Sequence, residues 1–272
     1  MNILIYDTEI INCILSKSEK IDHNLSYCLG WDDYSGMGIS VVGTWRNYDL
    51  LKMGENRLTI PKPLGKFEAF VNENNLLNQH LGNNLNSFNC LQKIVNRADK
   101  IVGFNSTAFD DKLCQANGID IKTNYDLLSE IRIATNQPAE YVYGLTRNGY
   151  ALKDLSRANL TINKTSTGEL APVLWQKGKK QEVIDYCLND VKILKELYFL
   201  FIKGELYDPT NGGKLPYKKG SLIRIEVDGL GQKIIALYLG AEKANPRHYH
   251  YSNYYFLPLE KLEVWKKLTN NL

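Results

Sequence analysis

The sequence predicts an α/β domain in which helices flank a mixed β-sheet. The first observation behind this is that short apolar or β-branched runs of strand length dominate the first seventy or so residues. The second is that segments with apolar residues at helical spacing follow and alternate with further strands. Strands first, then strands interleaved with helices, are typical of one mixed sheet covered by helices.

Three N-terminal runs are predicted to be strands. Residues 2–8 form an apolar run that ends in polar residues, as a buried central strand does. Residues 37–45 are rich in β-branched side chains and follow the turn-like stretch 33–36. Residues 66–71 form a plausible third strand, and the Gly- and Pro-containing stretch before them predicts an irregular loop.

Helical spacing of apolar residues begins in the next part of the chain and recurs toward residue 202. The strongest case is 181–202, where one wide apolar stripe runs along the segment. The predicted helices are 84–99, 110–117, 150–160 and 181–202, with a strand at 101–104 before the second of them. Asn117 and Gly118 are a typical helix end.

A change of character after residue 202 predicts two parts, an α/β domain over 1–202 and a C-terminal extension over 203–272. Residues 203–213 are rich in turn formers and are interpreted as a linker. Residues 221–228 alternate apolar and charged side chains, and with 232–239 they predict a β-hairpin. Residues 258–268 could form a short helix.

Composition narrows the class of protein. The 272 residues include 33 basic and 30 acidic side chains, and a net charge of +3 argues against binding that depends on bulk positive charge. No apolar run reaches the roughly 18 residues that a membrane span needs, and the N-terminus lacks the pattern of a secretory signal. Five widely spaced cysteines favour neither a disulfide framework nor a zinc site, so the expected location is the cytoplasm, with no membrane partner.

Acidic residues occur where core elements should not carry them. Asp7 and Glu9 alternate at the end of the first strand, so their carboxylates share one face. Asp110 lies where a strand runs into a helix, and Tyr186 and Asp190 are one helical turn apart. Each alone has an ordinary structural interpretation: a strand end that meets solvent, an acid in the first turn of a helix, and an acid at the edge of an apolar stripe.

Together the three elements resemble the exonuclease motifs of the DnaQ-like 3′–5′ exonucleases, which have the RNase H-like fold. The order is Asp-x-Glu at residue 7, Asn-x-x-x-Phe-Asp at residue 105, and Tyr-x-x-x-Asp at residue 186. More closely, it resembles the DEDDy subgroup, named for four acids and a tyrosine, which includes the proofreading domains of family B DNA polymerases. The resemblance covers about residues 1–202 and implies an RNase H-like mixed sheet.

The resemblance implies a metal-dependent 3′–5′ exonuclease that releases nucleoside 5′-monophosphates from single-stranded or frayed DNA. Its catalytic residues would be Asp7, Glu9, Asp110, Tyr186 and Asp190. The four acids would hold two Mg²⁺ or Mn²⁺ ions, because hard cations prefer oxygen ligands. Tyr186 would orient the attacking water, since a phenol with a pKa near 10 is a poor base at neutral pH.

Substrate contacts are predicted at two places. Asn105 and Phe109 belong to the second motif, although core packing is the competing interpretation for Phe109. Lys177, Lys179 and Lys180 precede the third motif and could bind backbone phosphates, or could simply lie in a solvated loop. Many members of the family have Thr after the Glu of the first motif, where this chain has Ile10.

The C-terminal extension has its own composition. Residues 203–272 hold 11 basic and 7 acidic side chains and seven of the 17 tyrosines, which is consistent with a stacking platform for single-stranded nucleic acid. An oligomerisation arm or a lid on the first domain are the alternatives.

Two other functions compete with DNA degradation. An RNA- or oligonucleotide-trimming exonuclease would use the same acids, because discrimination by the 2′-hydroxyl depends on contacts that the sequence does not define. The third is a nucleic-acid-binding module that has kept the fold without catalysis, against which the complete set of acids speaks. Nucleic acid is the expected partner in all three cases.

Overall fold

The computed structural model describes residues 1–15, 21–48, 65–71, 85–161, 168–210, 212–216, 222–227, 232–241 and 254–258. The chain divides into two compact units, residues 1–127 with 164–195 and residues 128–163 with 196–272. Each unit is described by itself. The predicted division at residues 202 and 203 stays a prediction.

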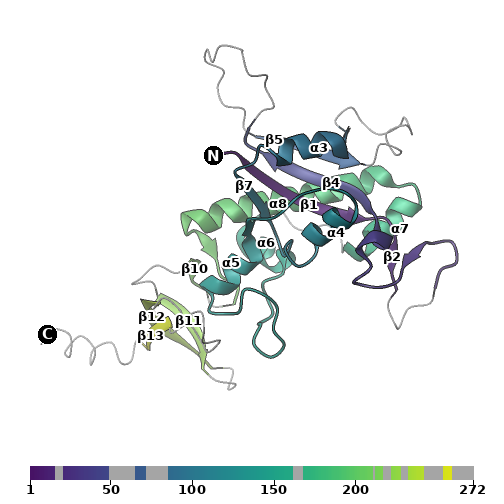
Figure 1. The fold of residues 1–272 in the computed structure, drawn as a ribbon. Coiled ribbons are helices and arrows are strands. Elements are labelled where there is room, and N and C mark those ends of the chain that lie inside the picture. The colour runs from purple at the N-terminus through teal and green to yellow at the C-terminus, as the bar shows by residue number, and fades with distance from the viewer. Residues whose placement is uncertain are drawn as a thin grey trace, which may run out of the picture. The chain divides into compact units, whose positions relative to one another are not determined.

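A mixed sheet forms the centre of the first unit (Figure 1). Its order is β6-β5-β4-β1-β7-β8. Strand β1 pairs antiparallel with β4 and parallel with β7, and β4 pairs antiparallel with β5. Strands β6 and β8 extend the two edges in parallel pairs. The bounds are β1 Ile3–Ile10, β4 Ile39–Arg46, β5 Lys66–Val71, β6 Leu85–Ser87, β7 Lys100–Gly103 and β8 Tyr125–Asp126.

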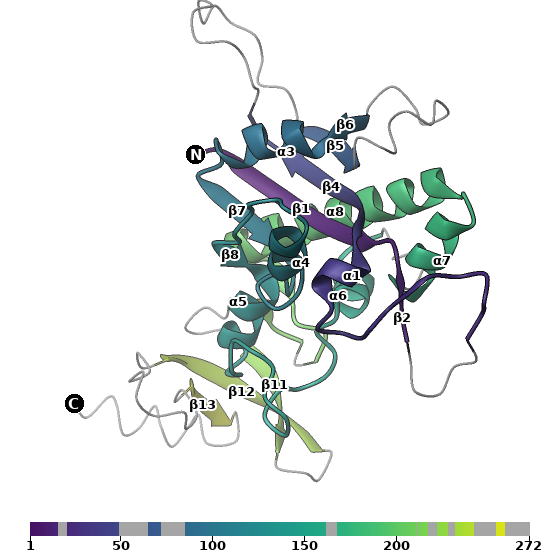
Figure 2. The same cartoon turned by 45° about the vertical axis from the view of Figure 1, so that its right-hand side comes forward.

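Strand β1 is central and is covered on both faces, because its successive side chains point to opposite sides. Leu4 and Tyr6 belong to a core with α3 (Phe88–Val95) and α4 (Asp110–Ala116). A second core holds residues of β4 and β5 against α7 (Ala171–Gln176) and α8 (Lys180–Lys203). Figures 1 and 2 accordingly show α3 and α4 over one face of the sheet and α8 across the other. The predicted class, a mixed sheet flanked by helices, is confirmed.

A small subsidiary layer follows β1. Strands β2 (Cys13–Ile14) and β3 (Tyr27–Cys28) pair in parallel, and the short helix α1 (Tyr34–Met37) leads into β4. Gln176 fastens this layer to α7, since its side-chain amide donates to the carbonyls of Ile11 and Ser26 at 2.9 and 3.0 Å. Most of the turn predicted at 33–36 belongs to helix α1 in the structure.

Seven predicted elements agree with the structure within two residues at both ends. They are the strands at 2–8, 37–45, 66–71 and 101–104 and the helices at 110–117, 150–160 and 181–202. The helix predicted over 84–99 is wrong at its beginning. Residues 85–87 form β6, which pairs with β5, and α3 begins only at Phe88 after Ser87. Leu85 satisfied the helical spacing by coincidence, because an apolar residue at that position suits either a strand or a helix.

The second unit contains α5 (Leu127–Ala134), apart from its first residue, and α6 (Leu152–Asn159), together with short and longer strands. Strands β11 (Leu222–Val227) and β12 (Gln232–Ala241) form the predicted hairpin, and β13 (Tyr254–Pro258) adds a third antiparallel strand. The helix predicted at 258–268 lies, after its first residue, outside the described residues.

The stretch 203–213, predicted to be a linker, leads into and closes a small hairpin. Strand β9 (Leu206–Tyr207) pairs with β10 (Lys214–Leu215), and the turn between them surrounds the fully buried Asp208. Tyr150 donates its hydroxyl to the Asp208 carboxylate at 3.1 Å, and the backbone N–H of Thr210 donates at 2.8 Å. Glycine, proline, asparagine and aspartate suit a tight hairpin as well as a linker, so composition could not separate the two.

None of the helices within the described residues has the length and apolar character required to cross a bilayer.

Candidate functional site

The first part of the site is the end of β1. Asp7 and Glu9 alternate along the strand and so lie on one face of the sheet. Glu9 is only 7% exposed, and Asp7 is half-buried. The pairing of β1 with β4 shifts register between Glu9 and Ile10, so the strand is irregular immediately after the two acids. A pair of carboxylates on a largely buried face costs free energy unless a cation or proton offsets the repulsion.

Helix α8 approaches this face closely because β4 has a glycine there. Gly43 is the partner of Asp7 in the antiparallel ladder. A Cβ atom at Gly43 would lie 2.8 Å from Cys187 Sγ and 3.1 Å from Val191 Cγ2, closer than real Cβ contacts normally are. Cys187 donates its thiol hydrogen to the backbone carbonyl of Asp7, with Sγ 3.5 Å from the oxygen. The close approach therefore sets α8 directly against the end of β1.

Tyr186 and Asp190 lie on the same side of α8, and both are buried, at 7% and 2% exposed. Burial raises the pKa of the Tyr186 hydroxyl well above its usual value, and the negative charges of Asp190, Glu9 and Asp7 raise it further. These contributions require that all three carboxylates lie within electrostatic reach of one phenol. The structure thus brings together four of the five predicted catalytic residues: Asp7, Glu9, Tyr186 and Asp190.

Asp110 reaches the same end of β1 from the opposite helix layer. Thr8, between the two acids of β1, donates its hydroxyl to Asp110 Oδ1 in a short hydrogen bond. Helix α4 is fixed by its second residue, because Asp111 accepts hydrogen bonds from the Tyr6 hydroxyl and from the Thr123 hydroxyl. The charges of Asp111 and Asp126 raise the pKa of Asp110, and its place among the metal ligands stays a prediction.

The Asp110 carboxyl is predicted to make the stability of the metal-free protein fall as pH rises. Burial, followed by the charges of Asp111 and Asp126, raises the pKa of Asp110 from 3.8 to about 6, although the Thr8 hydrogen bond lowers it. Between about pH 4 and 6 the folded state therefore keeps a proton on Asp110 that the unfolded state has already released. The stabilisation that this proton supplies falls as the pH rises through this window and is fully lost above the folded pKa. Replacing Asp110 by asparagine in EDTA should raise the free energy of unfolding at pH 7.5 by up to about 3 kcal/mol.

The check is urea denaturation of both proteins at pH 7.5 and at pH 4. The stabilisation should disappear near pH 4, where Asp110 is protonated in the wild type as well. Asp185→Asn is the matched control, because Asp185 is an exposed acid on α8 and should show no such difference between the two pH values. An Asp110→Asn effect of equal size at both pH values would contradict the assignment.

The loop before α4 carries the predicted substrate residues Asn105 and Phe109. Asp126, at the end of β8, accepts the backbone N–H of Asn105 at 3.0 Å and both the N–H and the hydroxyl of Thr107. Asn105 has a φ of 61°, a left-handed conformation that asparagine tolerates better than most residues, and it is exposed. Phe109 is half-buried and packs against the edge of the core, as the competing interpretation expected. Neither observation tests a substrate contact.

The three predicted phosphate-binding lysines lie at the turn between α7 and α8, where Gly178 has a φ of 80°. Lys177 is exposed, Lys179 forms an ion pair with Glu182 at 3.0 Å, and the ammonium of Lys180 lies 5.1 Å from the centre of the Trp175 ring. Lys180 precedes Asp190 by ten residues, about 15 Å along the helix axis. Binding of phosphate by these lysines stays a prediction.

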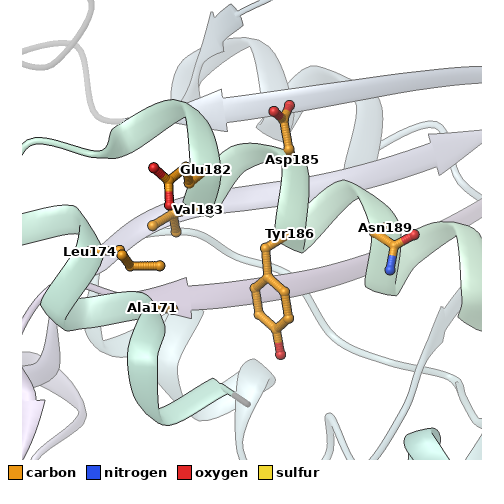
Figure 3. A pocket seen from close by; sticks show the side chains of 7 residues that line it. All are labelled: Ala171, Leu174, Glu182, Val183, Asp185, Tyr186 and Asn189. Atoms are coloured by element: carbon orange, nitrogen blue, oxygen red, sulfur yellow. The ribbon is translucent and has the colours of Figure 1, made fainter. Parts of the chain in front are cut away.

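A cavity of about 450 Å³ lies beside Tyr186 (Figure 3). In Figure 3 Tyr186 and Asn189 project on the same side of α8, and Asp185 projects away from them. The Asn189 amide nitrogen is buried and has no hydrogen-bond partner among the described residues. A donor of this kind is available to a bound ligand. The lining residues are Ala171, Leu174, Glu182, Val183, Asp185, Tyr186 and Asn189.

A metal ion would have ligands at the end of β1. Ligand atoms of Asp7, Glu9 and Cys187 lie within 4.8 Å of one another. Burial, together with the charges of Asp7 and Glu9, raises the pKa of the Cys187 thiol, so this group stays protonated at neutral pH. A protonated thiol is a poor ligand, whereas carboxylate oxygens suit hard divalent cations. The donor set therefore fits a cation such as Mg²⁺ or Mn²⁺ better than a soft metal.

Several residues of the site have no signal in the sequence. Thr8 and Asp126 act by hydrogen bonds to residues about a hundred and about twenty positions away. Gly43 and Cys187 matter only because β4 and α8 meet. Asn189 precedes Asp190 in the third motif and could have been noticed there, but its buried amide nitrogen is a property of the fold.

Comparison with protein-family models gave no match, and comparison with curated proteins gave none either. Among solved structures, the chain is similar to a family B DNA polymerase from the hyperthermophilic archaeon Pyrobaculum calidifontis, with a TM-score of 0.42 and 13% identity. The similar region covers 89% of this chain and 32% of the polymerase chain, so this chain spans about a third of that protein.

Proposed function

We propose that this protein is a metal-dependent 3′–5′ exonuclease of the DEDDy type, on an RNase H-like fold, acting on single-stranded or frayed DNA. The observation that carries the proposal is the convergence of Tyr186 and Asp190 from α8 on the carboxylates of Asp7 and Glu9 from β1. The three motifs that suggested this chemistry are separated by about a hundred and about eighty residues. That the first and third meet is therefore independent support.

Asp7, Glu9 and Asp190 are the residues that would hold divalent cations, with Asp110 reaching the same strand through Thr8. When bound, such cations supply a water molecule of lowered pKa and stabilise the oxygen that leaves the phosphorus. Without cations, three acids around a buried phenol repel one another, so the protein's own electrostatics favour cation binding. Mg²⁺ or Mn²⁺ is the proposed cofactor, as two ions.

Tyr186 holds its proton throughout the cycle in this proposal. Its raised pKa excludes a phenolate at neutral pH, so the hydroxyl can orient a water molecule by a hydrogen bond but cannot remove its proton. Asn189, from the next turn of α8, presents an N–H donor to the adjoining cavity and is proposed to contact the substrate there.

Tyr186→Phe is expected to slow cleavage by about 10- to 100-fold without stopping it, the range expected when one hydrogen bond to a charged group is lost. The measurement is the single-turnover rate on a 3′-labelled oligonucleotide. Tyr198→Phe is the control, because it removes the hydroxyl of another buried tyrosine on α8, about 18 Å along the helix axis. Wild-type rates in Tyr186→Phe would contradict the orienting role.

The proposal as a whole is tested by degradation of matched DNA and RNA oligonucleotides labelled at the 3′ or the 5′ end, with Mg²⁺, with Mn²⁺ and in EDTA. A 3′ label released first as a mononucleotide, only with metal and faster from DNA, supports it. Faster release from RNA favours the RNA-trimming alternative. No turnover on either substrate with Mn²⁺ would overturn the proposal in favour of a non-catalytic binding module.

A further inference from the structure

An unusually exposed tryptophan lies in the subsidiary layer of the first unit. Trp31 is 67% exposed and the nearby Leu29 is 93% exposed, whereas Trp45 and Trp175 are only 4% and 5% exposed. Tryptophan carries a large apolar surface, so leaving it in water forfeits stabilisation that burial would give. An exposed tryptophan is therefore typical of a surface that binds something.

Trp31 belongs to a group of three rings that ends at the candidate site. The centres of the Trp31 and Phe109 rings are 6.4 Å apart at an interplanar angle of 67°, and those of Tyr34 and Phe109 are 6.0 Å apart at 63°. Phe109 immediately precedes Asp110. We name Trp31, Tyr34 and Phe109 the aromatic ledge. It connects an exposed ring to the residue beside a predicted metal ligand.

The turn that carries Trp31 is held in one conformation. Asp33 accepts the backbone N–H groups of Leu29 and Gly36, each at 2.9 Å, and its own N–H donates to the carbonyl of Gly30 at 3.2 Å. Cys28 and Met37, on either side of the turn, are buried. A ring presented by a turn of this kind loses little conformational freedom when it binds a ligand.

Charge around the aromatic ledge favours contact with a base over contact with a phosphate at Trp31 itself. Asp32 and Asp33 directly follow the tryptophan in sequence and would repel a phosphate there. A positive charge lies beside the inner part of the ledge, because the ammonium of the exposed Lys112 is 5.9 Å from the centre of the Tyr34 ring. An apolar ring at the outer end and a cation at the inner end match the base and the backbone of one strand.

We propose that Trp31 stacks on an unpaired base of the strand whose 3′ end enters the site, and so selects single-stranded over duplex substrates. This inference rests on the proposed function, since it takes the ligand to be nucleic acid. In a duplex the faces of the bases are already stacked on their neighbours, so only an unpaired base can offer its face to the ring. Because every base has such a face, the selection is for strandedness and not for sequence.

The test is the equilibrium affinity of the full chain for a fluorescein-labelled oligothymidylate and for a blunt duplex of the same length, measured by anisotropy in EDTA, where no cleavage occurs. Trp31→Ala should weaken binding of the single strand by about 10-fold or more and leave binding of the duplex unchanged. Trp31→Phe, which keeps an aromatic face, should retain most of the affinity. Leu29→Ala is the matched control, because it removes a more exposed apolar side chain from the same turn and should leave both affinities unchanged.

The outcomes separate this inference from the proposed function. If the wild-type protein shows nuclease activity but Trp31→Ala binds the single strand with wild-type affinity, the stacking role is overturned and the exonuclease stands. If Trp31→Ala weakens binding of the single strand but the wild-type protein shows no nuclease activity, the stacking role stands and the exonuclease is overturned. Sedimentation velocity supplies a further outcome: a change of oligomeric state in Trp31→Ala with unchanged affinity for DNA would assign the aromatic ledge to a second copy of the chain and overturn the inference.

Discussion

Asp7→Asn is expected to reduce nuclease turnover by roughly 10³-fold or more while the protein stays folded, since charge stabilisation by bound cations amounts to several kcal/mol. Asparagine has the size of aspartate but not its charge, so the packing of β1 against β4 and α8 should persist. The contact of Asp7 with Cys187 involves the backbone carbonyl and is indifferent to the side chain. What the substitution removes is one of the carboxylates around Tyr186.

Two measurements check this expectation together, the single-turnover rate with Mn²⁺ and the melting temperature with and without Mn²⁺. A cation that binds only the folded state raises the melting temperature of the wild type, and this rise should shrink in Asp7→Asn. Asp120→Asn is the control, because this acid is exposed, does not line the cavity beside Tyr186, and bonds to Gln92 through its backbone. Cleavage by Asp7→Asn at the wild-type rate would remove Asp7 from the active site.

Gly43→Val is expected to cost about 3 kcal/mol of folding free energy, at the upper end for overpacked cores. The first added carbon already lies 2.8 Å from Cys187 Sγ and 3.1 Å from Val191 Cγ2. Both of these side chains are fully buried, so neither can swing into solvent and α8 itself must move. Tyr186 and Asp190 lie on that helix, so nuclease activity should fall even under conditions in which the variant is fully folded.

Urea denaturation gives the free energy. Gly168→Ala is the matched control, since among the described residues its Cβ would meet only Tyr186 Oη, at an ordinary 3.8 Å. Adding Cys187→Ala to Gly43→Val removes the sulfur atom that causes the closest contact and should recover part of the lost stability. A double-mutant cycle measures the recovery. If the two substitutions act additively, the close approach of β4 and α8 is not the source of the cost.

The sequence was sufficient where a pattern is local. Strands β4 and β5 and helices α4 and α8 follow from runs of β-branched residues or from one apolar stripe, and their bounds agree with the structure within two residues. Helices α5 and α7, of eight and six residues, were not predicted. The beginning of α3 was misplaced because Leu85 fits both a strand and a helix.

The candidate site divides in the same way. The acids and Tyr186 were predicted because their types and order resemble the motifs of a known family, and the structure brings Asp7, Glu9, Tyr186 and Asp190 together. Thr8, Gly43 and Asp126 were not, since each acts on a residue distant in sequence. The ion pair of Lys179 with Glu182 was likewise not predicted, and whether Lys179 binds phosphate stays a prediction.

Strand β1 places two different sets of polar groups on its two faces. Tyr6 and Thr8 hold α4 through Asp111 and Asp110, while Asp7 and Glu9 face the side of α8. Because side chains alternate, the loss or gain of one residue early in β1 would exchange the faces, placing carboxylates under α4 and a tyrosine under α8. Natural variants of this protein should therefore tolerate exchanges of apolar residues within β1 but not a change in its length. The length of β1 and the position of the candidate site should therefore be conserved together.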